Sequence, residues 1–105
     1  MNLISAQDLN QKMKETNDYF IVDIREPYEY EMANIGCKHI PMGEICDRIT
    51  ELPKDKINVV MCRSGKRAEA VANILQTDFS LPNVLILEGG ILAWKESIEP
   101  TLNLD

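Results

Sequence analysis

Apolar residues along this chain form two kinds of pattern, which alternate from one end to the other. Short continuous apolar runs, rich in β-branched and aromatic residues, are typical of strands buried on both faces of a sheet. Apolar residues spaced three or four apart are typical of helices that cover such a sheet. The runs predict five strands, at NLIS (2–5), YFIVDI (19–24), CKHIP (37–41), INVVMC (57–62) and NVLILEG (83–89).

Helical signals lie between the predicted strands. Ser5 followed by Asp8 resembles a capping box, and it predicts a helix that reaches about Glu15. Leu9 and Met13 lie on one face of that helix. The other predicted helices are EPYEYEM (26–32), with Pro27 in its first turn, MGEICDRITEL (42–52), with Ile45, Ile49 and Leu52 at helical spacing, residues 66–77, and GILAWKES (90–97).

Alternating strands and helices over 105 residues predict one α/β domain, residues 1–105, with a parallel sheet that helices cover on both faces. In sheets of this kind, ligands bind beyond the carboxyl ends of the strands. Cys62 and Asp23 both lie at such ends in the predicted strands. Both residues are therefore expected at the functional edge of the sheet.

Composition narrows the range of partners and compartments. The chain carries 17 acidic and 11 basic side chains, a formal charge of −6, so nucleic acid and anionic membrane surfaces are poor partners. Three cysteines do not make a disulfide framework. The start of the chain lacks the pattern of a signal peptide, and no apolar run approaches the roughly 20 residues that span a bilayer. We expect a soluble cytoplasmic protein.

Three cations interrupt this acidic pattern in one place, the sequence CRSGKR from Cys62 to Arg67. Arg63, Lys66 and Arg67 stand where a helix is predicted to begin. Backbone N–H groups already make that end of a helix positive, so each added cation typically costs about 0.3–1 kcal/mol. The pattern therefore predicts that a negative group occupies the start of this helix.

Cys62 is the candidate for that negative group. A cysteine between a strand and a helix lies among unpaired backbone N–H groups, which favour an anion, and neighbouring Arg and Lys side chains favour a thiolate as well. The thiolate is the nucleophilic form of cysteine. Gly65 allows a tight turn, and Ser64 can hydrogen-bond locally. The plainer alternative is a small buried cysteine that ends a strand, followed by a solvated turn of cations.

Four motifs, in the right order, resemble those of rhodanese-like sulfurtransferases, and the resemblance covers essentially residues 2–97. CRSGKR resembles the active-site loop of the family, and the other motifs are VDIREPYEYE, IPMGEI and LEGGILAWKE. The resemblance implies a compact α/β domain with a mainly parallel five-stranded sheet. It also implies that Cys62 takes a sulfane sulfur from a donor, holds it as a persulfide, and passes it to a thiophilic acceptor.

The resemblance and the chemistry of the loop together define an expected site. Cys62 is the expected catalytic residue, and Asp23 and Arg25 are expected to support it. The donor is an anion such as thiosulfate or a persulfide, which a partner protein could carry, and the acceptor is cyanide or a thiol. We expect no cofactor and no metal. The expected substrate-binding residues are Arg63, Ser64, Gly65, Lys66 and Arg67.

Loop length distinguishes this chain from related cysteine enzymes. Four residues stand between Cys62 and Arg67, whereas the similar loops of cysteine phosphatases have five and wrap a tetrahedral oxyanion. The shorter loop favours one extra sulfur over phosphatase or arsenate reductase chemistry. Two alternatives remain open. A carrier that receives its persulfide from a partner protein is compatible with every motif, and a non-catalytic interaction module is disfavoured because Cys62 is present.

Several contacts are predicted for Asp23 and the residues that follow it. Asp23 is expected to accept loop N–H groups, to face Arg67, or to cap the next turn. Arg25 and Glu29 are predicted to form an ion pair that holds their segment against the sheet. The segment ANIGC (33–37) is one residue shorter than its counterpart in relatives and lacks a proline found there. The resemblance therefore does not predict the path into the strand at 37–41.

The remaining reactive side chains are interpreted as packing residues. His39, the single histidine, lies within a predicted strand, and a thiolate already formed needs no general base. The spacing of Cys37, His39 and Cys46 matches no standard zinc pattern. Trp94 is expected to pack under the last helix rather than to line the site.

Overall fold

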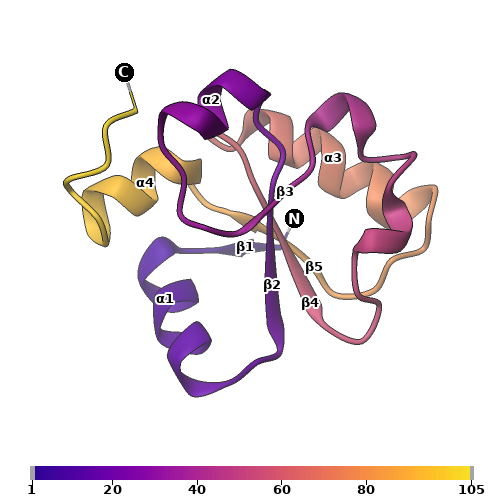
Figure 1. Ribbon diagram of the computed structural model, residues 1–105. Coiled ribbons are helices and arrows are strands. Elements are labelled where there is room, and N and C mark those ends of the chain that lie inside the picture. The colour runs from indigo at the N-terminus through magenta and orange to yellow at the C-terminus, as the bar shows by residue number, and fades with distance from the viewer. Residues whose placement is uncertain (1, 105) are drawn as a thin grey trace.

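The computed structural model describes residues 2–104 and has a five-stranded sheet at its centre (Figure 1). The order across the sheet is β1-β5-β4-β2-β3, and each of the four neighbouring pairs is parallel. The α/β class and the five strands are confirmed, and the sheet is entirely parallel. The strands are β1 (Leu3–Ile4), β2 (Tyr19–Asp23), β3 (Lys38–His39), β4 (Ile57–Met61) and β5 (Val84–Leu87).

Helices cover both faces of this sheet, as predicted. Residues of α3 pack against one face, and residues of α1 and α4 pack against the other, while α2 lies above the carboxyl ends of the strands (Figure 1). None of the helices within residues 2–104 is long and apolar enough to cross a membrane. The helices are α1 (Ala6–Glu15), α2 (Pro27–Met32), α3 (Lys66–Thr77) and α4 (Gly90–Ser97).

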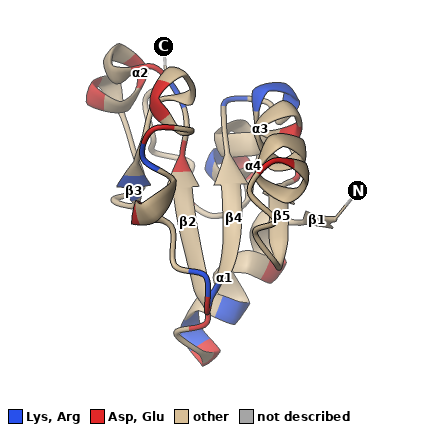
Figure 2. Ribbon diagram, turned by 90° about the vertical axis from the view of Figure 1, so that its right-hand side faces the viewer, with Lys and Arg blue, Asp and Glu red and all other residues tan. Residues whose placement is uncertain are grey.

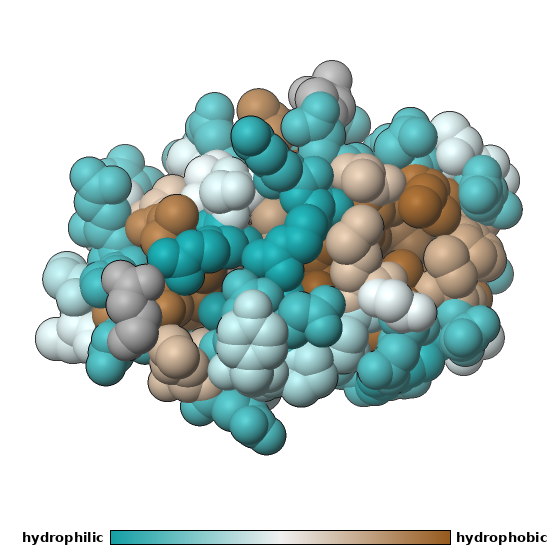
Figure 3. All heavy atoms as spheres, turned by 90° about the horizontal axis from the view of Figure 1, so that it is seen from above, coloured by the Kyte–Doolittle hydropathy of each residue, from teal (hydrophilic) through white to brown (hydrophobic). Residues whose placement is uncertain are grey.

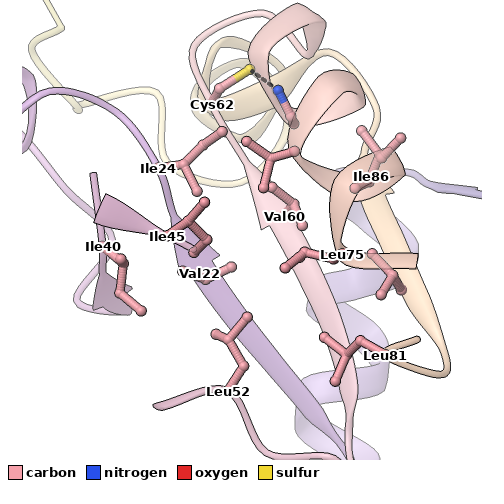
Figure 4. Packing of buried hydrophobic residues seen from close by; sticks show 14 residues of the cluster. Val22, Ile24, Ile40, Ile45, Leu52, Val60, Cys62, Leu75, Leu81 and Ile86 are labelled. Atoms are coloured by element: carbon pink, nitrogen blue, oxygen red, sulfur yellow. Dashed lines mark hydrogen bonds between the residues drawn. The ribbon is translucent and has the colours of Figure 1, made fainter. Parts of the chain in front are cut away.

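The central strands are apolar on both faces because each face has its own core. Val60 of β4 lies beside Val22 of β2 in the sheet, and both are completely buried in the core under α3 (Figure 4). Val59 and Met61 alternate with Val60 and are completely buried in the core under α1 and α4. Burial on both sides holds β4 firmly, and β4 leads directly to Cys62.

The start of α1 confirms the predicted cap. The Ser5 hydroxyl accepts the Asp8 backbone N–H at 3.1 Å, which satisfies one of the N–H groups that the first helical turn leaves unpaired. Leu9 is completely buried, but Met13 on the same face is 44% exposed. The apolar stripe of this helix therefore contacts the core mainly at its beginning.

The prediction of one helix over residues 42–52 is wrong. The segment forms two short 3₁₀ helices, η1 (Met42–Glu44) and η2 (Ile49–Glu51), with a turn between them. Its aliphatic residues still reach the core, since Ile45 and Leu52 are each 2% exposed. Tertiary packing of these side chains overrides the weak helical preference of the segment. A 3₁₀ helix also rises further per residue than an α-helix, so the segment is more extended than predicted.

The shortened segment 33–37 is a turn that Asn34 stabilises. The Asn34 side chain accepts the Gly36 N–H at 2.9 Å and donates to the Tyr30 carbonyl oxygen at 3.0 Å. Gly36 has a φ of 77°, in the left-handed region that glycine adopts readily. The Tyr30 ring then stacks on His39 with 4.3 Å between ring centres. This stack fixes the path into β3 that the sequence did not predict.

Candidate active site

The candidate site lies at the carboxyl ends of β2 and β4, as predicted. Asp23 and Met61 are register partners at those ends, and Cys62 follows Met61 directly. Figure 2 shows the strands side by side, with cationic residues on the loop after β4 and at the start of α3, and acidic residues on α2. Seen from above, hydrophilic side chains cross the middle of this face between hydrophobic ones (Figure 3).

Cys62 points its sulfur at the start of α3. The sulfur accepts backbone N–H groups from Gly65 at 3.0 Å and from Ala68 at 3.3 Å. Figure 4 shows the Cys62 sulfur with a hydrogen bond from within the buried cluster. Gly65 is the N-cap of α3 and has a φ of 108°, which allows the chain to curl around the sulfur. Cys62 is 1% exposed, whereas Ser64 is exposed at the outside of the loop. N–H groups arranged in this way are placed to hold negative charge on the sulfur.

The three loop cations have three different placements. The Arg63 guanidinium is half-buried and donates to the Leu104 carbonyl oxygen at 3.4 Å. Lys66 is exposed and lines one end of a groove of about 480 Å³ that runs beside α3. Arg67 forms a two-pronged ion pair with Glu29 of α2, with hydrogen bonds of 2.8 and 3.1 Å. Arg67 is therefore engaged by α2, whereas the Lys66 side chain is open to solvent beside the loop.

The ion pairs around Asp23 differ from those predicted. The predicted ion pair between Arg25 and Glu29 is wrong, because Arg25 pairs with Asp23 instead. The distance between Arg25 Nη2 and Asp23 Oδ2 is 2.8 Å. Both side chains are buried, with exposed fractions of 1% for Arg25 and 0% for Asp23. Arg67 pairs with Glu29 and not with Asp23. The predicted cap is confirmed, because Asp23 Oδ1 accepts the Arg25 backbone N–H at 3.0 Å. Arg25 also donates to the Ala33 carbonyl oxygen at 2.8 Å, so the pair joins β2 to the end of α2.

Comparison with known proteins agrees with this geometry. A family model described as a rhodanese-like domain matches residues 5–97. The chain belongs to the rhodanese-like family. A crystal structure of a rhodanese-related protein from Thermoplasma volcanium superimposes with a TM-score of 0.82 at 33% identity, covering 95% of this chain and 96% of that one.

Two curated proteins are similar to this chain in sequence. A sulfurtransferase of Allochromatium vinosum is 40% identical over 96 residues, which cover 90% of this chain and 88% of that protein. A putative sulfur carrier protein of Bacillus subtilis is 33% identical over 97 residues, which cover 91% of this chain and 52% of that protein.

The other reactive side chains of this rhodanese-like domain lie outside the loop. Cys37 is half-buried, and burial raises the pKa of its thiol to about 12, whereas Cys46 is exposed. His39 Nε2 lies 2.8 Å from the Arg25 carbonyl oxygen. No three His, Cys, Asp or Glu side chains within residues 2–104 form a group that could hold a metal ion. Trp94 of α4 is 5% exposed and packs in the core that α4 shares with α1, as expected.

The pairing of Glu29 with Arg67 leads to a prediction about pH. The hydrogen bond from Arg67 lowers the pKa of Glu29 below its ordinary value of 4.5. A carboxyl group with a lowered folded-state pKa stabilises the fold above the unfolded-state pKa, and this contribution is lost as pH falls through the folded-state pKa. Glu29→Gln keeps an oxygen for the Glu26 N–H. We expect it to lower the free energy of unfolding by about 1 kcal/mol at pH 7.

Urea unfolding of both proteins at pH 7 and pH 3 measures this effect. The difference between wild type and Glu29→Gln should shrink at pH 3, because this pH lies below the ordinary carboxyl pKa of 4.5, so the unfolded wild type binds a proton that folding with a charged Glu29 must release. An equal difference at both pH values would show that the charge of Glu29 does not stabilise the fold. Lys12→Ala, at an exposed ion pair on α1, is the control for loss of a surface contact.

Two features of this site have weak signals in the sequence. Glu29 belongs to the family's first motif, but nothing in its spacing indicates Arg67 as its partner. Gly90 follows Gly89 after β5, and a pair of glycines at the end of a strand suggests a close approach of two backbones. The structure identifies what approaches: the peptide groups that follow Cys62.

Proposed function

We propose that this protein is a sulfurtransferase that moves a sulfane sulfur from an anionic donor, through a persulfide on Cys62, to a thiol or cyanide. The observation that carries the proposal is the buried Cys62 sulfur, which accepts the N–H groups of Gly65 and Ala68 at the start of α3. Membership of the rhodanese-like family and the similarity to a named sulfurtransferase support it. We place the reaction in the cytoplasm, within one domain of residues 1–105.

The proposed reaction has two steps and needs no cofactor. In the first step, the Cys62 thiolate attacks the outer sulfur of thiosulfate, the sulfur–sulfur bond of the donor breaks, and sulfite leaves with its electron pair. In the second step, cyanide attacks the outer sulfur of the persulfide, and thiocyanate leaves while the Cys62 thiolate is restored. The N–H groups of Gly65 and Ala68 stabilise the negative sulfur at both stages.

A second candidate function is a sulfur carrier that accepts its persulfide from a partner protein. The similarity to a putative sulfur carrier protein favours this alternative. Both functions use the same Cys62 persulfide, and they differ in the donor. A phosphatase or arsenate reductase would require the longer loop, and the four residues between Cys62 and Arg67 argue against it.

Intact mass measurement tests the proposal. The protein is mixed with thiosulfate, and we expect one added sulfur on Cys62, which cyanide removes. If thiosulfate adds no sulfur but a protein persulfide does, the carrier function replaces the proposed one. If neither donor adds sulfur, sulfur transfer is excluded. Hydrolysis of an aryl phosphate, measured in parallel, would instead indicate a phosphatase.

The loop cations are expected to select an anionic donor. Two unit charges about 5 Å apart attract by roughly 3 kcal/mol at an effective dielectric constant of about 20, and solvent reduces this at an open site. We therefore expect Arg63→Ala and Lys66→Ala each to reduce kcat/KM for thiosulfate by about five- to thirtyfold, equivalent to roughly 1–2 kcal/mol. The loss should become smaller as salt is added, because salt already weakens the wild type.

Steady-state kinetics at two salt concentrations measure these losses. Lys12→Ala, at an exposed cation on α1, is the matched control and should leave thiosulfate kinetics unchanged. Lys66→Ala is the cleaner of the two variants, because Arg63→Ala also removes the hydrogen bond to the Leu104 carbonyl oxygen. Unchanged kinetics and salt dependence in both variants would mean that these cations do not bind the donor.

A further inference from the structure

The first turn of α4 lies directly against the peptide groups that follow Cys62. The Ile91 N–H donates to the Cys62 carbonyl oxygen at 2.8 Å, and the Leu92 N–H donates to the Arg63 carbonyl oxygen at 3.2 Å. N–H groups in the first turn of a helix have no partner within the helix. Here two of them bind the loop that carries the sulfur, so α4 holds this loop from outside.

Gly90 makes this close approach possible. It is buried and has a φ of 62°, and a Cβ atom at this position would lie 2.4 Å from the carbonyl oxygens of both Cys62 and Arg63. A side chain here would therefore push α4 and the loop apart. Gly36 has a similar φ of 77°, but nothing lies within 4 Å of the corresponding Cβ position. Gly90 thus has a steric reason to be glycine in addition to its backbone conformation.

Holding these two carbonyl groups also sets the direction of two N–H groups. In a planar trans peptide, the C=O and the N–H point to opposite sides. The Cys62 carbonyl shares its peptide group with the Arg63 N–H, and the Arg63 carbonyl shares its own with the Ser64 N–H. With both carbonyl groups bonded to α4, these N–H groups point away from α4. The chain then continues to Gly65, whose N–H binds the sulfur.

We propose that Gly90 is a positioning residue for the sulfur chemistry of Cys62. Because it lacks a side chain, the first turn of α4 can hold the start of the loop whose Gly65 and Ala68 N–H groups bind the sulfur. The inference rests on the proposed function, since it requires negative charge on the Cys62 sulfur or on a sulfur attached to it. Gly90 touches neither donor nor acceptor, and it acts through the orientation of the loop.

The Gly90→Ala variant, compared with Gly36→Ala, tests this role. Both substitutions place alanine at a positive φ, but Gly90→Ala alone also displaces the loop. We expect Gly90→Ala to slow persulfide formation from thiosulfate by at least about tenfold, since a small displacement of reacting groups has a large effect on rate. It should also shift the pH profile of Cys62 alkylation by iodoacetamide to higher pH. Gly36→Ala should match the wild type in both measurements.

Peptide mapping assigns the alkylation to Cys62, and circular dichroism establishes that each variant is folded. A folded Gly90→Ala protein with the wild-type persulfide rate and alkylation profile would overturn the inference. Alkylation needs no sulfur donor, so it tests Gly90 even if thiosulfate proves not to be a substrate and the proposed function fails.

If Gly90→Ala does not fold, hydrogen exchange in the wild type tests whether α4 holds the Cys62 loop. The Ile91 and Leu92 amides are then expected to exchange as slowly as the amides of β4, because both are bonded to the loop. Rapid exchange of both amides in the wild type would show that α4 does not hold the loop, and the inference would be wrong.

Discussion

We expect the Cys62→Ser variant to lose sulfur transfer, with kcat/KM for thiosulfate reduced by at least about a thousandfold. The Ser oxygen cannot form a persulfide, and a hydroxyl is a weak nucleophile without an adjacent base. Serine has almost the same shape as cysteine, and its oxygen can still accept the N–H groups of Gly65 and Ala68. The far-UV spectrum and melting temperature should therefore remain close to those of the wild type.

The double variant Cys37→Ala, Cys46→Ala is the matched control for this experiment. Burial keeps Cys37 a neutral thiol at pH 7, because it raises the pKa of that thiol to about 12. Cys46 is exposed, outside the Cys62 loop. The double variant should form persulfide at nearly the wild-type rate. Substantial transfer by Cys62→Ser, or loss of transfer in a folded double variant, would mean that another thiol takes part.

We expect Asp23→Asn to lower the free energy of unfolding by about 3–5 kcal/mol. The substitution preserves shape but leaves the charge of Arg25 buried without its ionic partner, and Arg25 is 1% exposed. Arg25 also holds the Ala33 carbonyl oxygen at the end of α2, so a displaced Arg25 would loosen that helix. At about 4–8 °C per kcal/mol, the melting temperature should fall by well over 10 °C.

Thermal and urea unfolding measure this loss. Arg48→Ala is the control, because Arg48 pairs with Glu44 and Glu51 at the surface and should change the melting temperature little. At a temperature where Asp23→Asn is folded, the initial rate of sulfur transfer should remain within a fewfold of the wild type. A stable Asp23→Asn variant with greatly reduced transfer would instead place Asp23 in the chemistry of the site.

The amino-acid sequence predicted the central elements of this fold because their signals are local. The runs at 19–24 and 57–62 are apolar except at Asp23 and Asn58, and a nearly continuous apolar run is typical of a strand buried on both faces. Cys62 was predicted in the same way, since a strand end, a glycine and three cations meet within six residues. All of these signals lie close together along the chain, and none depends on a distant partner.

The segment 42–52 shows where local signals fail. Its apolar spacing predicts a helix, but the structure has two 3₁₀ turns that place Ile45 and Leu52 in the core. Intrinsic helix preference amounts to a few tenths of a kcal/mol per residue, whereas burying one aliphatic side chain contributes about 1.5–3 kcal/mol. The shape of the space beside the sheet therefore decided the local conformation.

The sequence by itself determined the strands, the place of Cys62 at a strand end and the cationic loop, whereas only the tertiary structure decided the partners of the charged residues and the support of that loop. Arg67 bonds to Glu29, 38 residues away, and the Cys62 peptide bonds to Ile91 of α4. A charged side chain can pair with any opposite charge, and a carbonyl oxygen can accept any N–H or O–H group, so the sequence does not specify which partner is used. Hydrogen bonds require contact at about 3 Å, and the packing of α2, α3 and α4 around the sheet determines which groups come that close.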